Sequence, residues 1–441
     1  MPIKVGMISL GCPKNQVDAE IMLASLHGEG FELTNEAGLA DVVIINTCGF
    51  IEDAKKESIE NILEMGLLKK EGTIKGIVVS GCLAQRYFED IKQEFPEVNC
   101  IVSVGCAGEI VNAVKAAFEN KTLHLYGEPQ DLKLSGERIV STLPFYAYLK
   151  VAEGCDNCCT YCIIPKLRGR FRSRPMEELI AEARKLANGG VRELILVAQD
   201  TTRYGEDLYG KLRLPELLHE LCKIKKLVWI RVLYCYPDRI TDELIDAIAT
   251  EPNIAKYLDI PIQHINDRIL KAMHRRGSKQ QTLEVINKLR DKIPGIILRT
   301  TVITGFPSES EQEFEELAEF VSVTKFERLG AFAYSCEEGT AAALLDGQLD
   351  DEIKQHRQQI IMEQQESISM DFNEQQIGKT IKVVTEGFDK YAECYFGRSE
   401  ADAPDIDGKV FFTSKAKVRI GTFVNVKITE TMDWDLMGEV V

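Results

Sequence analysis

Three cysteines near the middle of the chain have the spacing of a cluster-binding motif. They are Cys155, Cys159 and Cys162, in the sequence Gly-Cys-Asp-Asn-Cys-Cys-Thr-Tyr-Cys of residues 154–162. Thiols this close together make poor disulfide partners, whereas iron–sulfur clusters are held by Cys thiolates at short spacings of this kind. A cubane cluster has four irons, so three cysteines leave one iron open to bind and cleave a small molecule. The spacing therefore predicts a catalytic cluster.

Zinc is the alternative for this segment, because it contains a fourth cysteine. Cys155-x2-Cys158 followed by Cys159-x2-Cys162 would supply four thiolates. Zinc-binding cysteine pairs are normally separated by a dozen or more residues, and here the two pairs are adjacent. An iron–sulfur cluster is therefore the favoured interpretation, and Cys158 leaves open which three cysteines bind it.

A second set of three cysteines lies in the first hundred residues, and each follows a short apolar segment that we expect to be a strand. Because sites in parallel α/β sheets form just beyond the carboxyl ends of the strands, these thiols are expected to converge. A glycine beside each cysteine allows close approach of a bulky ligand. Three unrelated buried thiols would explain the residue type but not the repeated position. The cysteines are Cys12 after residues 3–10, Cys48 after 42–46 and Cys82 after 77–80.

Strands and helices alternate along most of the chain, which predicts an α/β fold with parallel sheets. Residues 1–120 indicate a doubly wound parallel sheet, and residues 121–141 have the composition of a linker. Residues 142–372 hold six strand patterns with helices between them, which fits an open, partial (β/α)6 barrel. The Cys155 triplet follows its first strand, at the end where barrel enzymes place their chemistry. Residues 373–441 predict a small antiparallel β-barrel.

The individual elements that carry this interpretation are read from apolar periodicity. The first region has expected helices at 16–27, 51–68 and 85–94, and a connecting helix is expected at 351–371. The strands of the two later regions are expected at 146–152, 193–198, 229–233, 257–262, 296–304 and 329–334, and then at 381–386, 392–396, 409–413 and 423–429.

The bulk composition indicates a soluble globular chain whose cysteines stay reduced. Of the 441 residues, 45% are hydrophobic and 28% charged, which is ordinary for such a chain. Thirteen cysteines without a secretion signal point to the cytoplasm and to metal or redox use. No apolar run approaches the ~18 residues of a membrane helix. We therefore expect a cytoplasmic protein with no membrane association.

The net charge of −16 bears on the kind of partner. It argues against broad nucleic-acid binding, which depends on Lys and Arg neutralising phosphates. It suits a basic partner, although acidity that only aids solubility explains it equally well.

The Cys155 triplet, with Tyr161 directly before its last cysteine, resembles the signature of the radical S-adenosylmethionine (SAM) enzymes. A three-cysteine α/β domain, a radical SAM core and a small C-terminal barrel, in that order, resemble the methylthiotransferases over essentially the whole chain. Several strings are similar to the RimO branch of that family, which modifies a small-subunit ribosomal protein. They are Gly11-Cys12-Pro13-Lys14-Asn15 followed by Val17-Asp18, Ala198-Gln199-Asp200-Thr201-Thr202, Asp259-Ile260-Pro261-Ile262-Gln263-His264, and Ala403-Pro404-Asp405-Ile406-Asp407-Gly408.

The resemblance implies two 4Fe–4S clusters and two SAM molecules. In the radical SAM enzymes the open iron chelates the methionine part of SAM, and one electron splits SAM to a 5′-deoxyadenosyl radical that abstracts hydrogen from an unactivated carbon. The second SAM of the family donates a methyl group to sulfur on the auxiliary cluster. Carried over, the auxiliary cluster is on Cys12, Cys48 and Cys82, and the SAM cluster is on Cys155, Cys159 and Cys162.

The resemblance also implies contacts to SAM outside the triplet. Tyr161 is the expected platform for the adenine, which favours Cys159 over Cys158 as the second ligand. Gln199 and Asp200, at the end of the second barrel strand, are expected to contact the SAM amino group. Gly305 ends the fifth strand, where the backbone approaches the cofactor. Arg231 lies inside an apolar strand and needs a carboxylate partner, either on SAM or substrate or in a structural salt bridge.

Cys158 departs from the family pattern, in which a non-cysteine is usual, and exposes the motif to mis-ligation. His264 and His274 are expected to be structural, since a radical mechanism needs little acid–base catalysis. The basic run at residues 166–174 is expected either to hold carboxylates or to form a solvated face.

The implied substrate is the β-carbon of an aspartate in small-subunit ribosomal protein number twelve, with an electron donor such as flavodoxin or ferredoxin and a separate sulfur source. The alternative is a transfer-RNA adenosine, because related enzymes modify transfer RNA and use the C-terminal barrel to bind it. From residue 373 to the end there are nine Lys or Arg and twelve Asp or Glu, a net charge of −3. An acidic barrel is poorly suited to phosphate contacts and well suited to a basic ribosomal protein. We therefore expect no direct nucleic-acid substrate.

Overall fold

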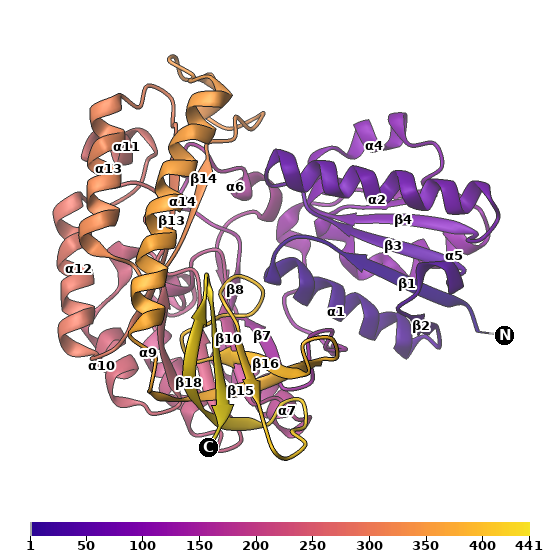
Figure 1. Cartoon of the computed structure of the whole chain (residues 1–441). Coiled ribbons are helices and arrows are strands. Elements are labelled where there is room, and N and C mark those ends of the chain that lie inside the picture. The colour runs from indigo at the N-terminus through magenta and orange to yellow at the C-terminus, as the bar shows by residue number, and fades with distance from the viewer. Residues whose placement is uncertain (1) are drawn as a thin grey trace.

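The computed structural model describes residues 2–441. The N-terminal region forms a parallel sheet with its strands in the order β2-β1-β3-β4-β5-β6 (Figure 1). The central strands β3 and β4 are buried along their whole length, as the Val- and Ile-rich strands of a two-sided parallel sheet are. The strands are β1 (Lys4–Ser9), β2 (Glu32–Thr34), β3 (Val42–Thr47), β4 (Gly76–Gly81), β5 (Cys100–Val102) and β6 (Leu123–Leu125).

Helices cover both faces of this sheet, as predicted for a doubly wound domain. The apolar residues of α1 and α5 pack on one face and those of α2 and α4 on the other. The helices are α1 (Pro13–Gly28), α2 (Glu52–Lys70), α3 (Cys82–Arg86), α4 (Phe88–Glu94) and α5 (Ile110–Phe118). Strand β6 lies in the segment predicted as a linker, so the sheet extends past residue 120.

The central region forms a second parallel sheet, in the order β14-β13-β12-β11-β10-β7, whose two ends do not pair with each other. This is the open, partial barrel that the sequence predicts. Its strands are β7 (Tyr146–Lys150), β10 (Glu193–Val197), β11 (Trp229–Val232), β12 (Ile254–Asp259), β13 (Ile297–Thr304) and β14 (Arg328–Ala333), and a short pair is formed by β8 (Ala152–Glu153) and β9 (Arg172–Ser173).

Helices surround the outside of this sheet (Figure 1), and a large apolar core lies between them and the strands. The helices are α6 (Ile164–Arg168), α7 (Met176–Asn188), α8 (Glu206–Tyr209), α9 (Leu214–Cys222), α10 (Asp242–Thr250), α11 (Asp267–Ala272), α12 (Lys279–Lys292) and α13 (Glu311–Thr324). The long helix α14 (Asp351–Glu374) lies beside edge strand β14 and leads to the C-terminal region.

The C-terminal strands close into a small barrel in the order β15-β16-β17-β19-β18. Its pairs are antiparallel except for β17 and β19, which run parallel. The strands are β15 (Thr380–Asp389), β16 (Cys394–Ser399), β17 (Val410–Thr413), β18 (Phe423–Met432) and β19 (Asp435–Val440). The sequence interpretation omitted β19 and therefore the parallel pair.

Buried ion pairs fix this C-terminal barrel to the central sheet, near the amino ends of its strands. Glu193, the first residue of β10, accepts hydrogen bonds from Arg398 at 2.7 Å and from Arg231 at 2.9 Å. At the other edge of the sheet, Arg328 donates to Asp402 at 2.7 Å. The paired arginines hold the pKa of the Glu193 carboxyl below its usual range, against the opposing effect of burial.

Arg398→Met removes one of the two cations that neutralise buried Glu193, so we expect a large loss of stability. Breaking a buried pair from one side costs about 3–5 kcal/mol, which should lower the thermal unfolding temperature measured by calorimetry. Arg419→Met, at an exposed arginine of the same barrel, should change stability by less than about 0.5 kcal/mol. Equal unfolding temperatures for the two variants would contradict the proposed role of the pair.

Candidate functional site

The three N-terminal cysteines follow three neighbouring strands. Cys12 comes after β1 and directly before α1, Cys48 follows β3, and Cys82 is the first residue of α3 after β4. The backbone at Gly11 is in the left-handed region (φ +85°), and a Cβ there would lie 2.9 Å from the Cys48 sulfur. Glycine is therefore required for this close approach. The topology places the three thiols at the carboxyl ends of neighbouring strands, on the same side of the sheet, as the sequence predicts.

Burial makes these thiols hard to ionise without a positive partner. Burial raises the pKa of Cys48 to about 12, and negative charge on Cys82 and Cys12 adds to the effect. The pKa of Cys82 is also raised by burial, and the Arg168 guanidinium opposes this rise. Arg168 donates from both Nε and Nη2 to the Cys82 sulfur, each at 3.3 Å. A cluster that bound the thiolates would supply the remaining positive charge.

The second triplet lies in the loop between β8 and α6. Cys155 and Cys159 are buried and Cys162 is partly buried, whereas Cys158 is exposed. Cys158 has a positive φ of 53°, and its carbonyl oxygen lies 3.0 Å from Nδ1 of His274. Its neighbour Cys159 is turned inward, with its sulfur 3.8 Å from the Tyr236 hydroxyl. This arrangement favours Cys155, Cys159 and Cys162 as the ligand set, because the side chain of Cys158 is exposed to solvent.

A buried charged network joins the two cysteine sites. Arg168 is the last residue of α6, the helix that follows Cys162, and it reaches Cys82 in the N-terminal domain. It also pairs with Asp18 of α1 and donates to Asn15 at 2.9 Å. Apolar contacts between Cys82, Ile163 and Leu167 support the same junction.

Two further charges complete this network from the central sheet. Lys150, fully buried, pairs with Asp18 and with Glu153 at 2.6 Å. Lys150 and Arg168 hold the pKa of Glu153 well below its usual range, although burial acts in the opposite direction. Each charge of the network therefore has a buried counterion, which is the condition for keeping it inside the protein.

A cavity of about 690 Å³ is lined by residues of the N-terminal domain and of the central region, including near neighbours of both cysteine sites. One wall is the segment after Cys48, from Phe50 to Asp53, and another is Tyr161, the neighbour of Cys162. The carboxyl ends of β13 and β14 supply Ile303, Ala333 and Tyr334. The cavity is therefore bordered by residues adjacent to both triplets, and the aromatic face of Tyr161 is available to it.

Gln199 and Asp200 lie at the carboxyl end of β10, beside the second triplet. Gln199 donates to Glu153 at 2.5 Å, and its own buried Oε1 accepts no hydrogen bond from residues 2–441. An orphaned buried acceptor of this kind fits the ammonium group of a ligand. Asp200 instead accepts from Asn157 of the cysteine loop at 2.9 Å. Its carboxylate therefore positions the loop.

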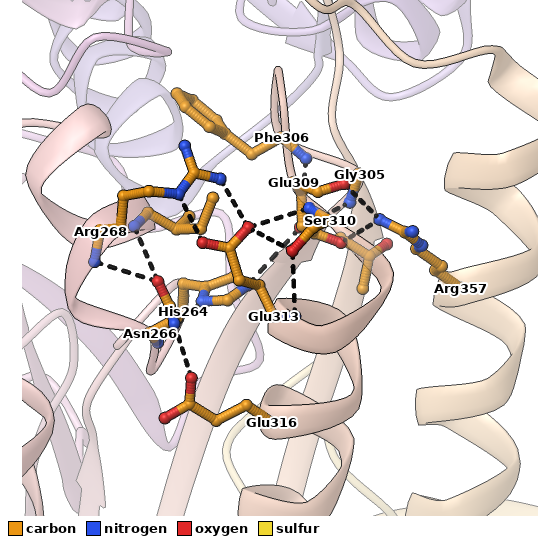
Figure 2. A network of polar contacts seen from close by, with 12 residues as sticks. His264, Asn266, Arg268, Gly305, Phe306, Glu309, Ser310, Glu313, Glu316 and Arg357 are labelled. Carbon is orange, nitrogen blue, oxygen red and sulfur yellow. Dashed lines mark hydrogen bonds and ion pairs between the residues drawn. The ribbon is translucent and has the colours of Figure 1, made fainter.

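Gly305 belongs to a polar network at the end of β13, shown in Figure 2. Glu309 is fully buried and accepts hydrogen bonds from the Gly305 amide at 3.0 Å and the Phe306 amide at 3.3 Å. Arg357 of α14 donates to the same carboxylate at 2.8 Å, and His264 Nε2 lies 3.5 Å away. A Cβ at Gly305 (φ +72°) would overlap Lys354. The turn is thus fixed from several sides, and His264 has a structural partner.

Arg231 is the predicted contact that does not lie with the others. It projects from β11 toward Glu193, near the amino ends of the strands, and donates to Glu193 and to the Glu400 carbonyl at 2.9 Å. Of the two alternatives left by the sequence, the structural salt bridge is therefore the one present. We remove Arg231 from the candidate cofactor contacts.

The basic run at residues 166–174 forms internal contacts. Lys166 donates to the Gly339 carbonyl at 2.7 Å, and Arg172 donates to the Pro129 carbonyl at 2.9 Å. Arg174 pairs with Glu182 at 2.6 Å. Sequence reasoning missed the role of Arg168 because the run has no periodicity that separates its buried members from its exposed ones. The signal available was two charged residues, Lys150 and Glu153, in an otherwise apolar strand segment.

The donor sets are suited to clusters. Each triplet offers three sulfur ligands, which is the ligand type that iron–sulfur clusters require. Within residues 2–441, no three His, Cys, Asp or Glu side chains are grouped as a site for a single metal ion.

The helices of the same residues include none that is long and apolar enough to cross a membrane.

Comparison with family models divides the chain into three matched segments. The Radical SAM superfamily matches residues 149–321, the TRAM domain matches residues 377–441, and Uncharacterized protein family UPF0004 matches residues 4–103. The UPF0004 and Radical SAM segments each contain one cysteine triplet, and the TRAM segment is the closed C-terminal barrel.

Several curated proteins are similar over the full length. Ribosomal protein uS12 methylthiotransferase RimO of Desulforamulus reducens is 51% identical over 439 residues, which cover 99% of each chain. The protein of the same name from Pelotomaculum thermopropionicum is 50% identical and covers 100% of each chain. Among solved structures, the radical SAM methyltransferase TsrM of Kitasatospora setae gives a TM-score of 0.56 at 13% identity, covering 75% of this chain and 73% of its own. That likeness extends to the fold alone.

Cys158→Ala and Cys159→Ala separate the two possible ligand sets. Because the Cys158 side chain is exposed and that of Cys159 is buried, we expect Cys158→Ala to keep the full iron content after anaerobic reconstitution. Cys159→Ala should lose the iron bound at that triplet. Iron and sulfide quantification together with the visible absorbance of the cluster measures both. Equal iron loss in the two variants would show that Cys158 is a ligand.

Arg168→Met should lower the reduction potential of a cluster bound by Cys12, Cys48 and Cys82, because hydrogen bonds to the sulfurs are one determinant of cluster potential. The measurement is an EPR-monitored redox titration in a background that lacks the second triplet through Cys155→Ala, Cys159→Ala and Cys162→Ala. Arg174→Met is the matched control, since Arg174 is equally buried but contacts no cysteine. An unchanged potential in Arg168→Met, with iron content retained, would rule out the effect.

Proposed function

The chain belongs to the RimO family of radical SAM methylthiotransferases, and from that premise we propose that it places a methylthio group on the β-carbon of an aspartate in ribosomal protein uS12. The observation that carries the proposal is the pair of cysteine triplets, which lie in two domains that Arg168 joins and which both have near neighbours on the wall of one cavity. Full-length relatives at about 50% identity, named for this reaction, support it. The reaction takes place where uS12 is made and assembled, in the cytoplasm.

We assign one 4Fe–4S cluster to each triplet and two SAM molecules to each turnover. The ligands are Cys12, Cys48 and Cys82 for the auxiliary cluster, and Cys155, Cys159 and Cys162 for the SAM cluster. When bound, the clusters supply an electron for SAM cleavage and an open iron for the sulfur to be transferred. An electron donor such as flavodoxin or ferredoxin and a sulfur source complete the partners. We keep the division into an N-terminal domain, a central domain at 142–372 and a C-terminal barrel at 373–441, but the N-terminal domain extends through β6 and the linker follows that strand.

The protein's own residues bind and orient the cofactor. Tyr161 offers an aromatic face to the adenine at the cavity wall. The unpartnered Oε1 of Gln199 accepts from the SAM ammonium group. The missing side chain of Gly305 makes room for Lys354 of α14, and buried Glu309 holds that turn in place through two amide hydrogen bonds. Asp200 acts indirectly: it accepts a hydrogen bond from Asn157 and so holds the cysteine loop in place.

The arrangement also explains how the substrate carbon is kept from water. The cavity is lined by the N-terminal domain and the carboxyl ends of β13 and β14, and the charged network of Arg168 and Asp18 joins the same two domains. The substrate aspartate must therefore enter from the open side, past the segment after Cys48. A site closed on the remaining sides protects a reactive intermediate from side reactions.

Modification of transfer RNA is the second candidate. The C-terminal barrel has a net charge of −3, and its Arg398 and Asp402 are buried in ion pairs with the central sheet. Phosphate recognition depends on exposed Lys and Arg. The charge thus supports a protein substrate over an RNA substrate.

The test is mass spectrometry of uS12 and of bulk transfer RNA from cells with and without the gene. We expect one methylthio group in place of a hydrogen on an aspartate-containing uS12 peptide, present only with the gene. Complementation with Cys12→Ala or with Cys155→Ala should not restore it, because each removes a ligand from one triplet. Complementation with Cys222→Ala, at a cysteine outside both triplets, should restore it. A methylthio group found instead on an adenosine, with uS12 unchanged, would assign the chain to the RNA-modifying branch.

A further inference from the structure

The open side of the 690 Å³ cavity is acidic. Four carboxylates line the cavity: Glu337 is buried in ion pairs with Lys55 and Arg86, and the three exposed ones are Glu52 and Asp53 in the first turn of α2 and Asp351 at the start of α14. Asp53 is 91% exposed and Asp351 is 84% exposed, while Lys354, the partner of Asp351, is almost fully buried. Lys55, the partner of Glu52, is likewise largely covered. We call these three carboxylates the acidic mouth, because all three are exposed while the lysine partners of Glu52 and Asp351 are covered; only Lys56, the partner of Asp53, is exposed as well.

A second cavity, of about 510 Å³, lies beside the first. It is bounded by β14, α14 and the C-terminal barrel, and the two cavities share Phe332 and Gln358 as lining residues. The barrel contributes Ile406 and Trp434 to its wall. Phe332 is 49% exposed, and Ile406 and Trp434 are also exposed in spite of their size. The two cavities are therefore adjacent along β14, and we call the pair, which together extends from the acidic mouth to the C-terminal barrel, the groove.

The groove follows β14 but does not offer that strand for pairing at its centre. The Gln358 side chain donates to the Ala331 carbonyl at 2.9 Å, and the Ala331 amide points at the Met362 sulfur 3.4 Å away. Both main-chain groups of Ala331 are thus occupied by side chains of α14. A ligand in the groove is recognised through its side chains and not by adding a strand to the sheet.

The length and chemistry of the groove indicate an extended polypeptide. The six residues of β14 run alongside it, and a strand of that length spans about 20 Å. One end offers carboxylates and the other offers aromatic and aliphatic side chains. Arg299 and Arg328, which also line the second cavity, are neutralised by Asp259 and Asp402. The charge that a ligand meets is therefore the negative charge of the mouth.

We propose that this groove binds an extended segment of uS12 next to the target aspartate, with basic residues of that segment at the acidic mouth and an apolar side chain between Phe332 and Trp434. The proposal rests on uS12 being the substrate. It differs from recognition by the acidic barrel surface as a whole, because it assigns affinity to the mouth and to one apolar contact. Such a contact also fixes how far the aspartate reaches into the cavity.

The test measures binding of fluorophore-labelled uS12 to the reconstituted enzyme by fluorescence anisotropy. We expect Phe332→Ala and Trp434→Ala each to weaken binding by about tenfold, as aromatic contacts at the centre of an interface do. Glu52→Lys with Asp53→Lys should weaken binding by about tenfold or more and should reduce its dependence on salt, because exposed charges attract a basic ligand in a salt-dependent way.

Matched controls separate the groove from general effects. Phe388→Ala removes an aromatic side chain of the barrel that is 48% exposed and lines neither cavity. Asp242→Lys with Glu243→Lys makes the same charge change in the first turn of α10, away from both cavities. Both controls should bind uS12 like the wild type. Iron content and unfolding temperature, measured for every variant, identify any that fail to fold.

The outcomes separate the groove from the proposed function. If the wild type modifies uS12 while the mouth and aromatic variants, folded and loaded with iron, bind it as tightly as the controls do, the groove is not the binding site. If the wild type leaves uS12 unmodified and modifies transfer RNA in the same mass-spectrometric assay, the proposed function itself is wrong. Selective weakening in the groove variants alone supports both.

Discussion

The arrangement of the two cysteine sites depends on one buried guanidinium. Arg168 is charged and almost fully covered, which is costly unless its donors are all matched. Its partners are Asp18 and Asn15 from the N-terminal domain, Glu153 from the central region, and the Cys82 sulfur. Because these acceptors come from both domains, the charge is satisfied only when the domains are docked. The requirement to satisfy this cation therefore helps to fix the relative position of the two triplets, together with buried Glu337 of the central region, which pairs with Arg86 and Lys55 of the N-terminal domain.

A second set of buried charges acts at the opposite end of the central sheet. Glu193 is shared between Arg231 and Arg398, and Arg328 pairs with Asp402, so the C-terminal barrel is bound across the amino ends of the strands. Buried pairs of this kind contribute orientation more reliably than net stability. The two networks leave the carboxyl ends of the strands open between them. The cavity beside Tyr161 is the space that results, and both of its walls are held by residues outside it.

Local patterns predicted much of this structure, and distant pairing accounts for what they missed. The strand-end cysteines and the triplet followed from residue order alone, because parallel strands bring their carboxyl ends together. Arg231 remained ambiguous because one member of its network, Arg398, lies more than 160 residues away. Arg168 was hidden within a basic run for the same reason, since its acceptor Asp18 is 150 residues distant. Strand β6, only three residues long, carried too little periodicity to be recognised.

The sequence separation within the Arg168 network has a consequence for how the chain acquires its structure during synthesis. Domains generally fold from the N-terminus as the chain emerges from the ribosome, and Asp18 and Cys82 are made well before Lys150 and Arg168. Until those cations arrive, the N-terminal sheet carries a carboxylate and three thiols that lack their final counterions, at an edge still open to solvent. Loop closure over such a distance adds an entropic cost that only docking of the finished domains offsets. The first cysteine site is therefore more exposed in the emerging N-terminal domain than in the finished chain, in which Ile163, Leu167 and Arg168 cover Cys82.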